Sequence, residues 1–464
     1  AVKSSNKKRS RNITIGAVIG FLLSCTVVMG EDNYLWIKED GGEIKFSTDS
    51  TTGADGGWKT TNPYSDNNWN KDTEPKTYTN NMILSSNKTD GNYGTNLSYG
   101  LRLSGELTDV NFVNNGSIIG IMRDTSGSSK GYGIYNSAKM GNIENTGVIS
   151  GSGIYNGSTN CYGYGIYNNS SAEIKDITNT GTISGIGDNT SSSQGYGYGI
   201  YNDSGAKIQD ITNTGLISGY GTGTRVVYGY GIYNSAEMGN IENKGIISGT
   251  GIDNTYDFGK GYGIYNDSSA EIQDITNTGV ISGYGTSLST SGEGYGINNN
   301  SGTMGAITNI GIISGYGKGS GGGNYGKGYG IYNGSAEIGN IENTGVISGY
   351  GDNSGGSGYG INNNSGKMGA ITNIGVISGY GINGDKYGKG YGYGIDNSAT
   401  MGNIENTGVI SGSTTSGAYC EGYGINNNSS DTIGGITNTG VIYGKTNAIK
   451  NNSGTIGTVD NYGI

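Results

Sequence analysis

The sequence predicts an all-β protein: a right-handed parallel β-helix or β-solenoid of about ten to eleven repeats with an irregular N-terminal cap. Two observations carry this prediction. Glycine accounts for 94 of 464 residues, and Ile, whose branched side chain suits a pleated strand, far outnumbers Leu. A Tyr-Gly-Ile motif also recurs from Tyr132 onward at steps of roughly 32 residues, which is typical of a repeat architecture.

Each repeat has a constant part and a variable part. In the first full copy, Tyr132-Gly133-Ile134 is followed by Asn145-Thr146-Gly147 and then by Ile149-Ser150-Gly151. The constant runs GYGIYN, MGNIEN and GVISG are long enough for short strands joined by tight corners. Between copies lies a segment of variable length, such as Gly185 to Tyr196, which we expect to be a surface loop. An alternative with two smaller coils per repeat would double the length of the rod.

Stacked coils would supply the core that one repeat lacks. No copy has enough apolar residues to bury a core alone, so we expect Ile to stack on Ile along a common interior. At about 4.8 Å per coil, ten coils would make a rod of roughly 48 Å. The Asn of each Asn-x-Gly motif would then form an amide ladder. This ladder comprises Asn145, Asn179, Asn213, Asn243, Asn277, Asn309, Asn343, Asn373, Asn406 and Asn438.

Two sets of tyrosines recur in register. The Tyr of the anchor motif is constant, and we interpret it as a structural ladder at a corner, although such a stripe can also bind sugars or stack with partners. The residue after the anchor Ile is less regular, since Asn or Asp replaces Tyr in several copies. This variable set is the better candidate for a contact face. It comprises Tyr135, Tyr167, Tyr201, Tyr233, Tyr265 and Tyr332.

The composition argues against an enzyme. The chain has no His, so it contains no Ser-His or Cys-His nucleophile pair and no imidazole metal ligand. Acidic residues such as Glu144 and Asp176 recur in register, whereas a catalytic site is a unique constellation. We therefore predict no catalytic residues, no metal site and no cofactor. A remote alternative is a glycan-processing lyase or hydrolase, in which one coil would break the repeat with its charged residues.

The two cysteines within the repeats are expected to be unpaired. Cys161 and Cys420 occupy equivalent positions in copies two and ten. Eight coils would separate them by about 38 Å, whereas a disulfide needs Cα atoms within about 7 Å. We therefore expect two lone thiols on loops.

The region before the repeats divides at about residue 30. Residues 1–30 have the order of a signal peptide, with basic residues before an apolar stretch from Ile13 to Met29. We expect a cleaved export signal; a retained anchor or lipidation at Cys25 are the alternatives. Residues 31–105 lack the repeat and contain all three Trp, so we predict an N-terminal cap, followed by the solenoid over residues 106–464. Without residues 1–30, 22 basic and 37 acidic residues remain, a net charge of −15, which argues against nucleic-acid binding.

The repeat pattern is also expected to continue past this sequence. Residue 1 is Ala, and an eleventh copy starts at Ile449 and stops at Ile464. We therefore expect the chain to be a fragment of a longer array.

The leader GAVIGFLLSCTVVMG, the following EDNYLWIKE and the Asn-x-Gly-x-Ile-Ser-Gly coils resemble passenger regions of bacterial autotransporters, particularly large fusobacterial-type surface proteins. The resemblance covers essentially the whole chain. It implies display on the bacterial cell surface or outer membrane, or secretion, with an outer-membrane β-barrel beyond the C-terminus of this sequence. It further implies an adhesin-like rod in contact with host cell-surface or matrix molecules, whether glycan or protein. Gly- and Asn-rich solenoids also occur in filamentous haemagglutinin-like proteins, which leaves a structural stalk or secreted rod without its own binding site as the alternative.

Overall fold

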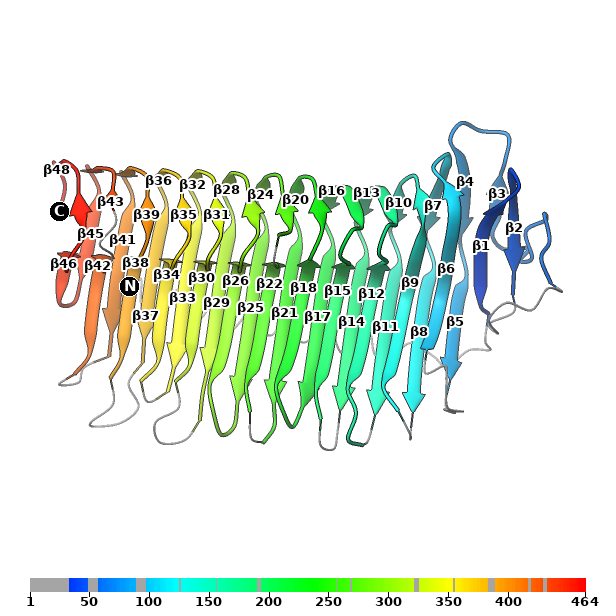
Figure 1. Ribbon diagram of the computed structural model, residues 1–464, viewed down its shortest axis with the longest axis horizontal. Helices are drawn as coiled ribbons and strands as arrows, with labels where there is room; N and C mark the ends of the chain where they lie inside the picture. Colours follow the sequence, from blue (N-terminus) through cyan, green and yellow to red (C-terminus); the bar gives the residue numbers. More distant parts are fainter. Residues whose placement is uncertain are drawn as a thin grey trace.

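The computed structural model describes residues 33–48, 57–88, 97–124, 127–155, 157–189, 193–255, 257–267, 269–320, 325–353, 355–382, 389–415, 419–428 and 432–464. Within these ranges the regular secondary structure is entirely β-strand, and no helix that could cross a membrane is present. Figure 1 shows coils stacked along one axis, from β1 (Leu35–Asp40) near one end to β48 (Val459–Asn461) at the other. The predicted parallel β-solenoid is confirmed.

The first row of strands, here called the tyrosine row, carries the GYGIYN motif. Successive members pair in parallel, each with the equivalent strand of the next coil. The row comprises β6 (Leu97–Leu107), β9 (Ser129–Met140), β12 (Cys161–Asn168), β15 (Gly195–Asn202), β18 (Val227–Asn234), β22 (Gly259–Asn266), β26 (Gly292–Asn299), β30 (Lys327–Asn333), β34 (Ser357–Asn363), β38 (Tyr391–Asn397), β42 (Glu421–Asn427) and β46 (Asn447–Asn451).

The second row, the corner row, carries the Ile-x-Asn motif. Its strand is continuous in β13 and β16, and from β19 onward two short strands take its place. The row comprises β7 (Val110–Asn114), β10 (Ile143–Asn145), β13 (Glu173–Asn179), β16 (Lys207–Asn213), β19 (Glu237–Met238), β20 (Ile241–Asn243), β23 (Glu271–Ile272), β24 (Ile275–Asn277), β27 (Thr303–Met304), β28 (Ile307–Asn309), β31 (Glu337–Ile338), β32 (Ile341–Asn343), β35 (Lys367–Met368), β36 (Ile371–Asn373), β39 (Thr400–Met401), β40 (Ile404–Asn406), β43 (Thr432–Ile433), β44 (Ile436–Asn438), β47 (Thr455–Ile456) and β48.

The third row, the serine row, carries the Ile-Ser-Gly motif and forms a 12-stranded parallel sheet of its own. It comprises β5 (Ile83–Lys88), β8 (Ser117–Asp124), β11 (Val148–Tyr155), β14 (Thr182–Asn189), β17 (Leu216–Gly223), β21 (Ile246–Asp253), β25 (Val280–Ser287), β29 (Ile312–Lys318), β33 (Val346–Asp352), β37 (Val376–Gly381), β41 (Val409–Thr414) and β45 (Val441–Gly444). One coil therefore runs through the tyrosine, corner and serine rows in turn.

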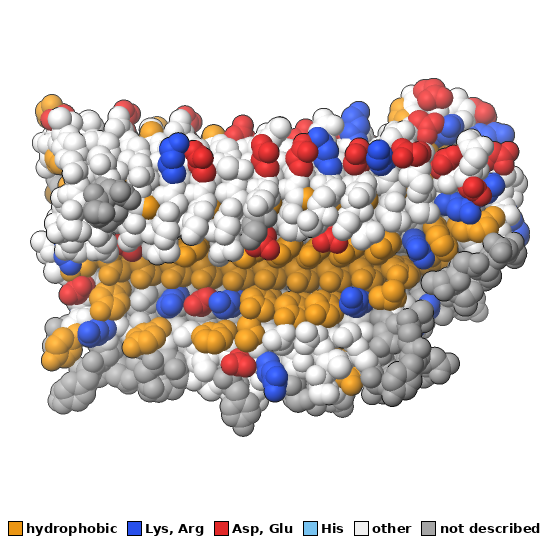
Figure 2. Space-filling view, viewed as in Figure 1, with side chains coloured by type: hydrophobic (Ala, Val, Ile, Leu, Met, Phe, Trp, Pro, Cys, Tyr) orange, Lys and Arg blue, Asp and Glu red, His pale blue; other side chains and the backbone are white. Residues whose placement is uncertain are grey.

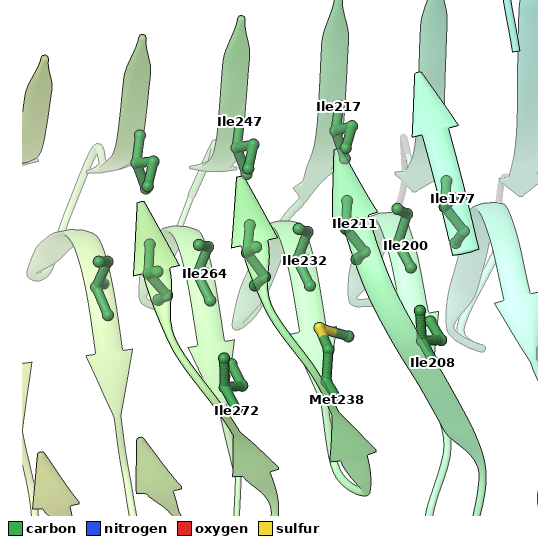
Figure 3. Packing of buried hydrophobic residues seen from close by; sticks show 14 of the residues in the cluster. Ile177, Ile200, Ile208, Ile211, Ile217, Ile232, Met238, Ile247, Ile264 and Ile272 are labelled. Atoms are coloured by element: carbon green, nitrogen blue, oxygen red, sulfur yellow. The ribbon is translucent and has the colours of Figure 1, made fainter. Parts of the chain in front are cut away.

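Identical residues stack on one another because the coils pair in register. Ile200 pairs with Ile232, and Ile211 pairs with Ile241 in the next coil. Figure 3 shows the Ile side chains of the three rows turned toward a common interior. Ile200, Ile211 and Ile217 are each at most 1% exposed. Full burial of such a side chain contributes about 2 kcal/mol, so the stacked core supplies stability that no single repeat could reach.

Glycine allows the tyrosine and serine rows to come into backbone contact in the part of each coil that has no Ile core. In the part of each coil farthest from the corner, the tyrosine and serine rows face each other through alternating glycines. A Cβ added at Gly185 would lie 1.9 Å from the carbonyl oxygen of Tyr198, and one added at Gly219 would lie 1.9 Å from that of Tyr230. The two sheets are therefore in backbone contact, with no room for a side chain between them.

This contact corrects the expectation that the segment between Gly185 and Tyr196 is a surface loop. Residues 185–189 lie in β14, and residues 195 and 196 lie in β15. Alternating Gly, Ser and Tyr is also the composition of a loop, which is why the segment was misassigned. Without side chains on one face, the same residues pack two strands together instead.

The N-terminal strands join the stack before the repeats begin. β1 pairs antiparallel with β2 (Glu43–Ser47) and parallel with β6, while β3 (Asn68–Asn70) pairs antiparallel with β4 (Lys76–Asn80). β4 and β5 then pair in parallel with β7 and β8. Aromatic side chains fill this end of the rod: Trp36 packs edge-on against Trp58 at 5.0 Å, and Phe46 packs against Trp69 at 5.6 Å. Parallel stacking thus already includes residues before position 106.

The two cysteines of the repeats are not loop thiols, contrary to the expectation. Cys161 is the first residue of β12 and is fully buried, and Cys420 directly precedes β42 and is 8% exposed. Burial raises the pKa of Cys161 to about 12, so its thiol is protonated at neutral pH. Both lie where the tyrosine row begins, which the sequence had placed in the variable segment. The leader with Cys25 lies outside the described residues.

Candidate functional site

The anchor tyrosines form one continuous ladder on the outside of the tyrosine row. Tyr164 and Tyr198 stack with ring centroids 5.0 Å apart and planes 7° from parallel, and Tyr198 stacks on Tyr230 in the same way. Each of these three rings is 6% exposed. Burial raises the pKa of Tyr164 well above its ordinary value, so its hydroxyl stays protonated.

A second column lies beside the first, formed by the variable tyrosines that the sequence selected as a contact face. The structure places all six of them, Tyr135, Tyr167, Tyr201, Tyr233, Tyr265 and Tyr332, in the tyrosine row and half-buried. Tyr201 and Tyr233 stack at 4.7 Å with planes 2° apart. Tyr167 also meets the anchor ring of Tyr164 edge to face at 5.0 Å. The two columns together, here called the tyrosine face, appear in Figure 2 as a hydrophobic band running along the rod.

Aspartates at the following turn hold the hydroxyl groups of several outer tyrosines. The hydroxyl of Tyr167 donates to Asp203 at 2.6 Å, and that of Tyr233 donates to Asp267 at 2.5 Å. Burial and then the adjacent carboxylate raise the pKa of Tyr233 far above its ordinary value. These hydroxyl groups are therefore neutral donors whose orientation is set by the protein.

The stacking determines what the tyrosine face can offer a partner. Each inner ring has a neighbour on both sides at about 5 Å, the separation at which aromatic rings are in contact. The flat faces of the rings are therefore covered by other tyrosines, and only edges and hydroxyl groups reach the surface. A sugar ring cannot stack on a covered face, so the face is suited to hydrogen bonds and edge contacts.

The outer column changes its chemistry toward the C-terminus. Asn362, Asp396 and Asn426 replace tyrosine there, and each is at most 8% exposed. The side-chain amides of Asn362 and Asn426 donate to the Asp396 carboxylate at 2.9 and 2.7 Å. Burial raises the pKa of Asp396 to about 6, despite the opposing effect of Asn426. Between Tyr135 and Asn426, Asp396 is thus the charged residue that interrupts the outer column.

A charged cluster lies near the first residues of the tyrosine-row strands, at the register position that Tyr162 occupies in an earlier coil. Glu293 lies between Lys260 at 3.0 Å and Lys327 at 3.6 Å, and it accepts a hydrogen bond from Tyr295 at 2.9 Å. Burial acts to raise the pKa of Glu293, but the two ammonium groups outweigh burial and hold that pKa below its ordinary value. In the preceding coils Tyr162, among others, occupies this register position, so the cluster replaces aromatic surface by a compact set of charges.

The ten asparagines selected from the sequence lie at the corner between the corner and serine rows. Asn179 shows the pattern: its amide donates to Oδ1 of Asn213 at 2.8 Å and to the carbonyl oxygens of Gly181 and Leu216 at 3.2 and 3.1 Å. The bonds that link the ten to one another measure 2.7 to 2.8 Å. All of them are buried, so they stabilise the stack and do not form a contact surface.

A second asparagine ladder was missed by the sequence analysis. It lies two residues after the anchor Ile, as in Asn168, whose amide donates to Asn202 at 2.9 Å. Its signal was available, because Asn occupies this position in every copy. Its members are Asn136, Asn168, Asn202, Asn234, Asn266, Asn299, Asn333, Asn363, Asn397, Asn427 and Asn451.

A tyrosine column on the opposite side of the rod was also missed. Tyr284, Tyr316 and Tyr350 lie on the serine row and stack at 5.1 Å, and the hydroxyl of Tyr316 donates to Asp352 at 2.6 Å. These residues follow the Ile-Ser-Gly motif, in the segment that the sequence analysis treated as a loop.

Two of the recurrent acidic residues accept hydrogen bonds from backbone groups of the next coil. Asp210 accepts from the backbone N–H of Asn240 at 2.7 Å, and Asp274 accepts from that of Ala306 at 2.6 Å. Within the described part of the chain, no three His, Cys, Asp or Glu side chains come close enough to hold a metal ion.

Comparisons with protein-family models, with curated proteins and with solved structures found no match to this chain. Inference of function therefore starts from the tyrosine face.

Proposed function

We propose that this chain is a surface-displayed, adhesin-like rod of the autotransporter passenger type, which contacts host cells or matrix through the tyrosine face. The observation that carries the proposal is the tyrosine face itself: a band of stacked rings with half-buried outer members and protein-oriented hydroxyl groups. Surface aromatic side chains with a polar tip are the type of residue that dominates protein contact surfaces.

Repetition of the tyrosine face along the rod can raise its apparent affinity for a partner. The same edge and hydroxyl group recur in successive coils, at about 4.8 Å per coil. A partner that binds one coil weakly can bind several at once, so the apparent affinity rises with the number of coils engaged. The stacked rings are already ordered, so binding costs little side-chain entropy.

The covered ring faces restrict the kind of partner. The host molecule, a protein or a glycan, would be recognised by hydrogen bonds to the hydroxyl groups and by contact with ring edges. No cofactor or catalytic step is part of the proposal, because the hydroxyl groups of the tyrosine face recur along the rod, whereas a catalytic site is a unique constellation. Export to the cell surface, or secretion, would be directed by the leader.

The test compares two matched sets of substitutions in residues 33–464, the part of the chain in which the described strands pair with one another. In the first variant, Tyr167, Tyr201, Tyr233 and Tyr265 are changed to Phe, which keeps the ring stack and removes the hydroxyl groups. In the control, Tyr284, Tyr316, Tyr350 and Tyr380 on the opposite side are changed to Phe. Binding to intact host cells, to matrix proteins and to a glycan array is measured by surface plasmon resonance and flow cytometry.

We expect saturable binding that is retained by the control and reduced at least tenfold in the first variant. Loss of binding in the control alone would move the contact to the serine row. A folded rod that binds nothing would support a second candidate, a structural stalk. One observation favours that candidate: the rings stack mainly on one another, as in the pair Tyr201 and Tyr233, and a purely structural ladder would do the same.

A further inference from the structure

Three columns of residues run along the outer surface of the serine row and form a flat face. Inward positions are taken by Ile and by the glycines that contact the tyrosine row, so the alternate residues point outward. The first outward column is mainly aliphatic: Val148, Thr182, Leu216, Ile246, Val280, Ile312, Val346, Val376, Val409 and Val441. We call this surface the serine face.

The middle column of the serine face is serine, and the third is mixed but rich in tyrosine. Serine recurs in register from Ser150 to Ser411, and Ser184 donates to Ser150 at 3.1 Å. The third column comprises Ser152, Ile186, Tyr220, Thr250, Tyr284, Tyr316, Tyr350, Tyr380 and Ser413. Small side chains therefore run between two rows of larger ones.

The three columns carry no charged residue, whereas the next outward position of the same strands holds Asp188, Lys318 and Asp352. In the three columns between Val148 and Val441, all of which the structure describes, no Asp, Glu, Lys or Arg occurs. Other sides of the rod differ: the corner row carries the ion pair of Lys367 with Glu337, and the start of the tyrosine row carries the Glu293 cluster. Next to the aliphatic column, Ile310 and Ile374 are 56% and 59% exposed. The equivalent residue of an earlier coil is Lys244, which pairs with Glu242 at 2.6 Å. Charged residues normally prevent a flat β surface from associating with another copy, and the three central columns of the serine face lack them.

We propose that the serine face binds the serine face of a second copy of this chain, so that two rods lie side by side. In a two-fold dimer the same patch is used by both partners. The serine column is the middle one, so it meets itself whether the rods run parallel or antiparallel. Its small side chains allow close approach, and the aliphatic and tyrosine columns pack on either side of it, as side chains do between paired sheets of stacked strands.

The size of the face is sufficient for a stable dimer. Ten coils at about 4.8 Å give a length of roughly 48 Å, and three outward columns span about 20 Å. The face therefore covers about 1,000 Å² on each copy, or about 2,000 Å² in the dimer, at the upper end of standard specific interfaces. The contact is independent of the tyrosine face, which remains free for a host partner.

The test measures the mass of residues 33–464 by sedimentation equilibrium across a range of concentrations. In one variant, Ser282→Arg and Ser348→Arg place charges in the middle of the proposed interface. The matched control, Thr276→Arg and Thr308→Arg, adds the same charges to outward positions of the corner row. Circular dichroism and thermal melting show whether each variant folds. The single substitution Ser348→Lys, whose flexible side chain can reach solvent in the monomer, serves if the double variant does not fold.

We expect the unmodified chain and the control to dimerise with the same dissociation constant. We expect the serine-face variant to dissociate at least a hundredfold more readily, because the introduced charges would be buried without partners. A chain that remains monomeric at about 100 µM, an affinity too weak for a specific dimer, would overturn the proposal. Equal weakening in both variants, or no effect of the serine-face variant, would overturn it as well.

Discussion

The buried asparagines of the Asn-x-Gly ladder bond to the coils on both sides of them, as Asn277 shows. The amide of Asn277 donates to Oδ1 of Asn309 at 2.8 Å and to the carbonyl oxygens of Gly279 and Ile312 at 3.3 and 3.1 Å. Its own Oδ1 accepts from Asn243 at 2.8 Å. An Asp could not donate, and an Ala could do neither, so the position requires an amide of this length.

The substitution Asn277→Ala should therefore lower the free energy of unfolding by about 3 kcal/mol, because it leaves the donor of Asn243 and two carbonyl oxygens buried without this partner. Chemical denaturation followed by circular dichroism measures the loss. The adjacent exposed residue provides the control: Thr278→Ala should cost less than about 1 kcal/mol. Equal losses in the two variants would contradict the structural role of the ladder.

Asp396 breaks the pattern of neutral stacking that the asparagines show. Its carboxylate accepts from Asn362 and Asn426, and the buried Oδ1 atoms of these two amides have no hydrogen-bond partner. An amide at position 396 would instead donate to one of them and extend a continuous ladder. The chain therefore retains a buried carboxyl where a neutral residue would satisfy more hydrogen bonds.

The pKa of Asp396, raised to about 6, predicts a pH dependence of stability. Because the folded-state pKa lies above the unfolded value of 3.8, folding disfavours ionisation. The contribution of the protonated Asp396 carboxyl to the free energy of unfolding is fully present below the unfolded pKa. It is lost as the pH rises through about 6. Asp396→Asn removes this dependence, so its advantage over the unmodified chain should grow by about 3 kcal/mol between pH 4 and pH 8. Urea denaturation across that range measures the difference; an advantage that is constant with pH would contradict the prediction.

At the scale of the strands, alternating glycine determines the shape of the coil. Glycines of the tyrosine and serine rows face one another, and the strands approach until backbone atoms touch. A Cβ at Gly219 would lie 1.9 Å from the carbonyl oxygen of Tyr230 and 2.4 Å from that of Gly197. The far part of the coil is thus a two-layer sandwich without side chains between the layers, and its outer surfaces carry the tyrosine columns.

Gly219→Ala should force these two layers apart and destabilise the rod by about 3 kcal/mol, the upper range for overpacking. Thermal melting and limited proteolysis near this coil measure the effect. Ser218→Ala is the matched control, because its side chain points outward from the same strand and its loss should shift the melting temperature little. If the two variants melted alike, the layers would have to be less closely packed than the structure shows.

At the scale of the whole molecule, the rod is a one-dimensional array in which each coil contacts its neighbours. Equivalent residues such as Tyr262 and Tyr295 occupy paired positions in adjacent coils, and the same register holds along the serine row. Stability in such arrays is approximately a sum of coil and interface contributions. The number of coils can therefore change without changing the fold.

Deleting residues 262–294, which joins Gly261 to Tyr295 and removes one complete coil, should leave a folded rod that is shorter by about 5 Å. Small-angle X-ray scattering measures the length, and thermal melting measures the stability. Deleting residues 262–278 removes only part of a coil and serves as the comparison. That variant should melt at a much lower temperature, because one coil would keep its serine-row strand β25 while losing β23, β24 and most of β22. Equal melting of the two deletions would argue against coil-by-coil stacking.

The repeat made it possible to predict which residues stack between coils. It did not show which residues of each strand face the core and which face outward. Parallel coils in register must place Ile on Ile and Asn on Asn, so the core and one amide ladder could be read from the spacing alone. The pairing register, however, passes over Gly165, and Tyr164 and Tyr167 both lie on the outer surface with rings 5.0 Å apart. Strict alternation from the buried Ile166 would have placed Tyr164 inside, and periodicity alone cannot reveal such a bend.

The sequence by itself therefore determined the class of fold, the coil as its unit and the residues that stack, because identical copies in parallel register repeat every contact. Only the tertiary structure decided which surfaces the coil exposes. The close approach of the two glycine-lined layers turns an apparent loop into strands. Stacking between coils covers the flat faces of the tyrosines, and three uncharged columns lie on the outside of the serine row. These features depend on contacts between rows far apart in the sequence, and no local pattern specifies such contacts.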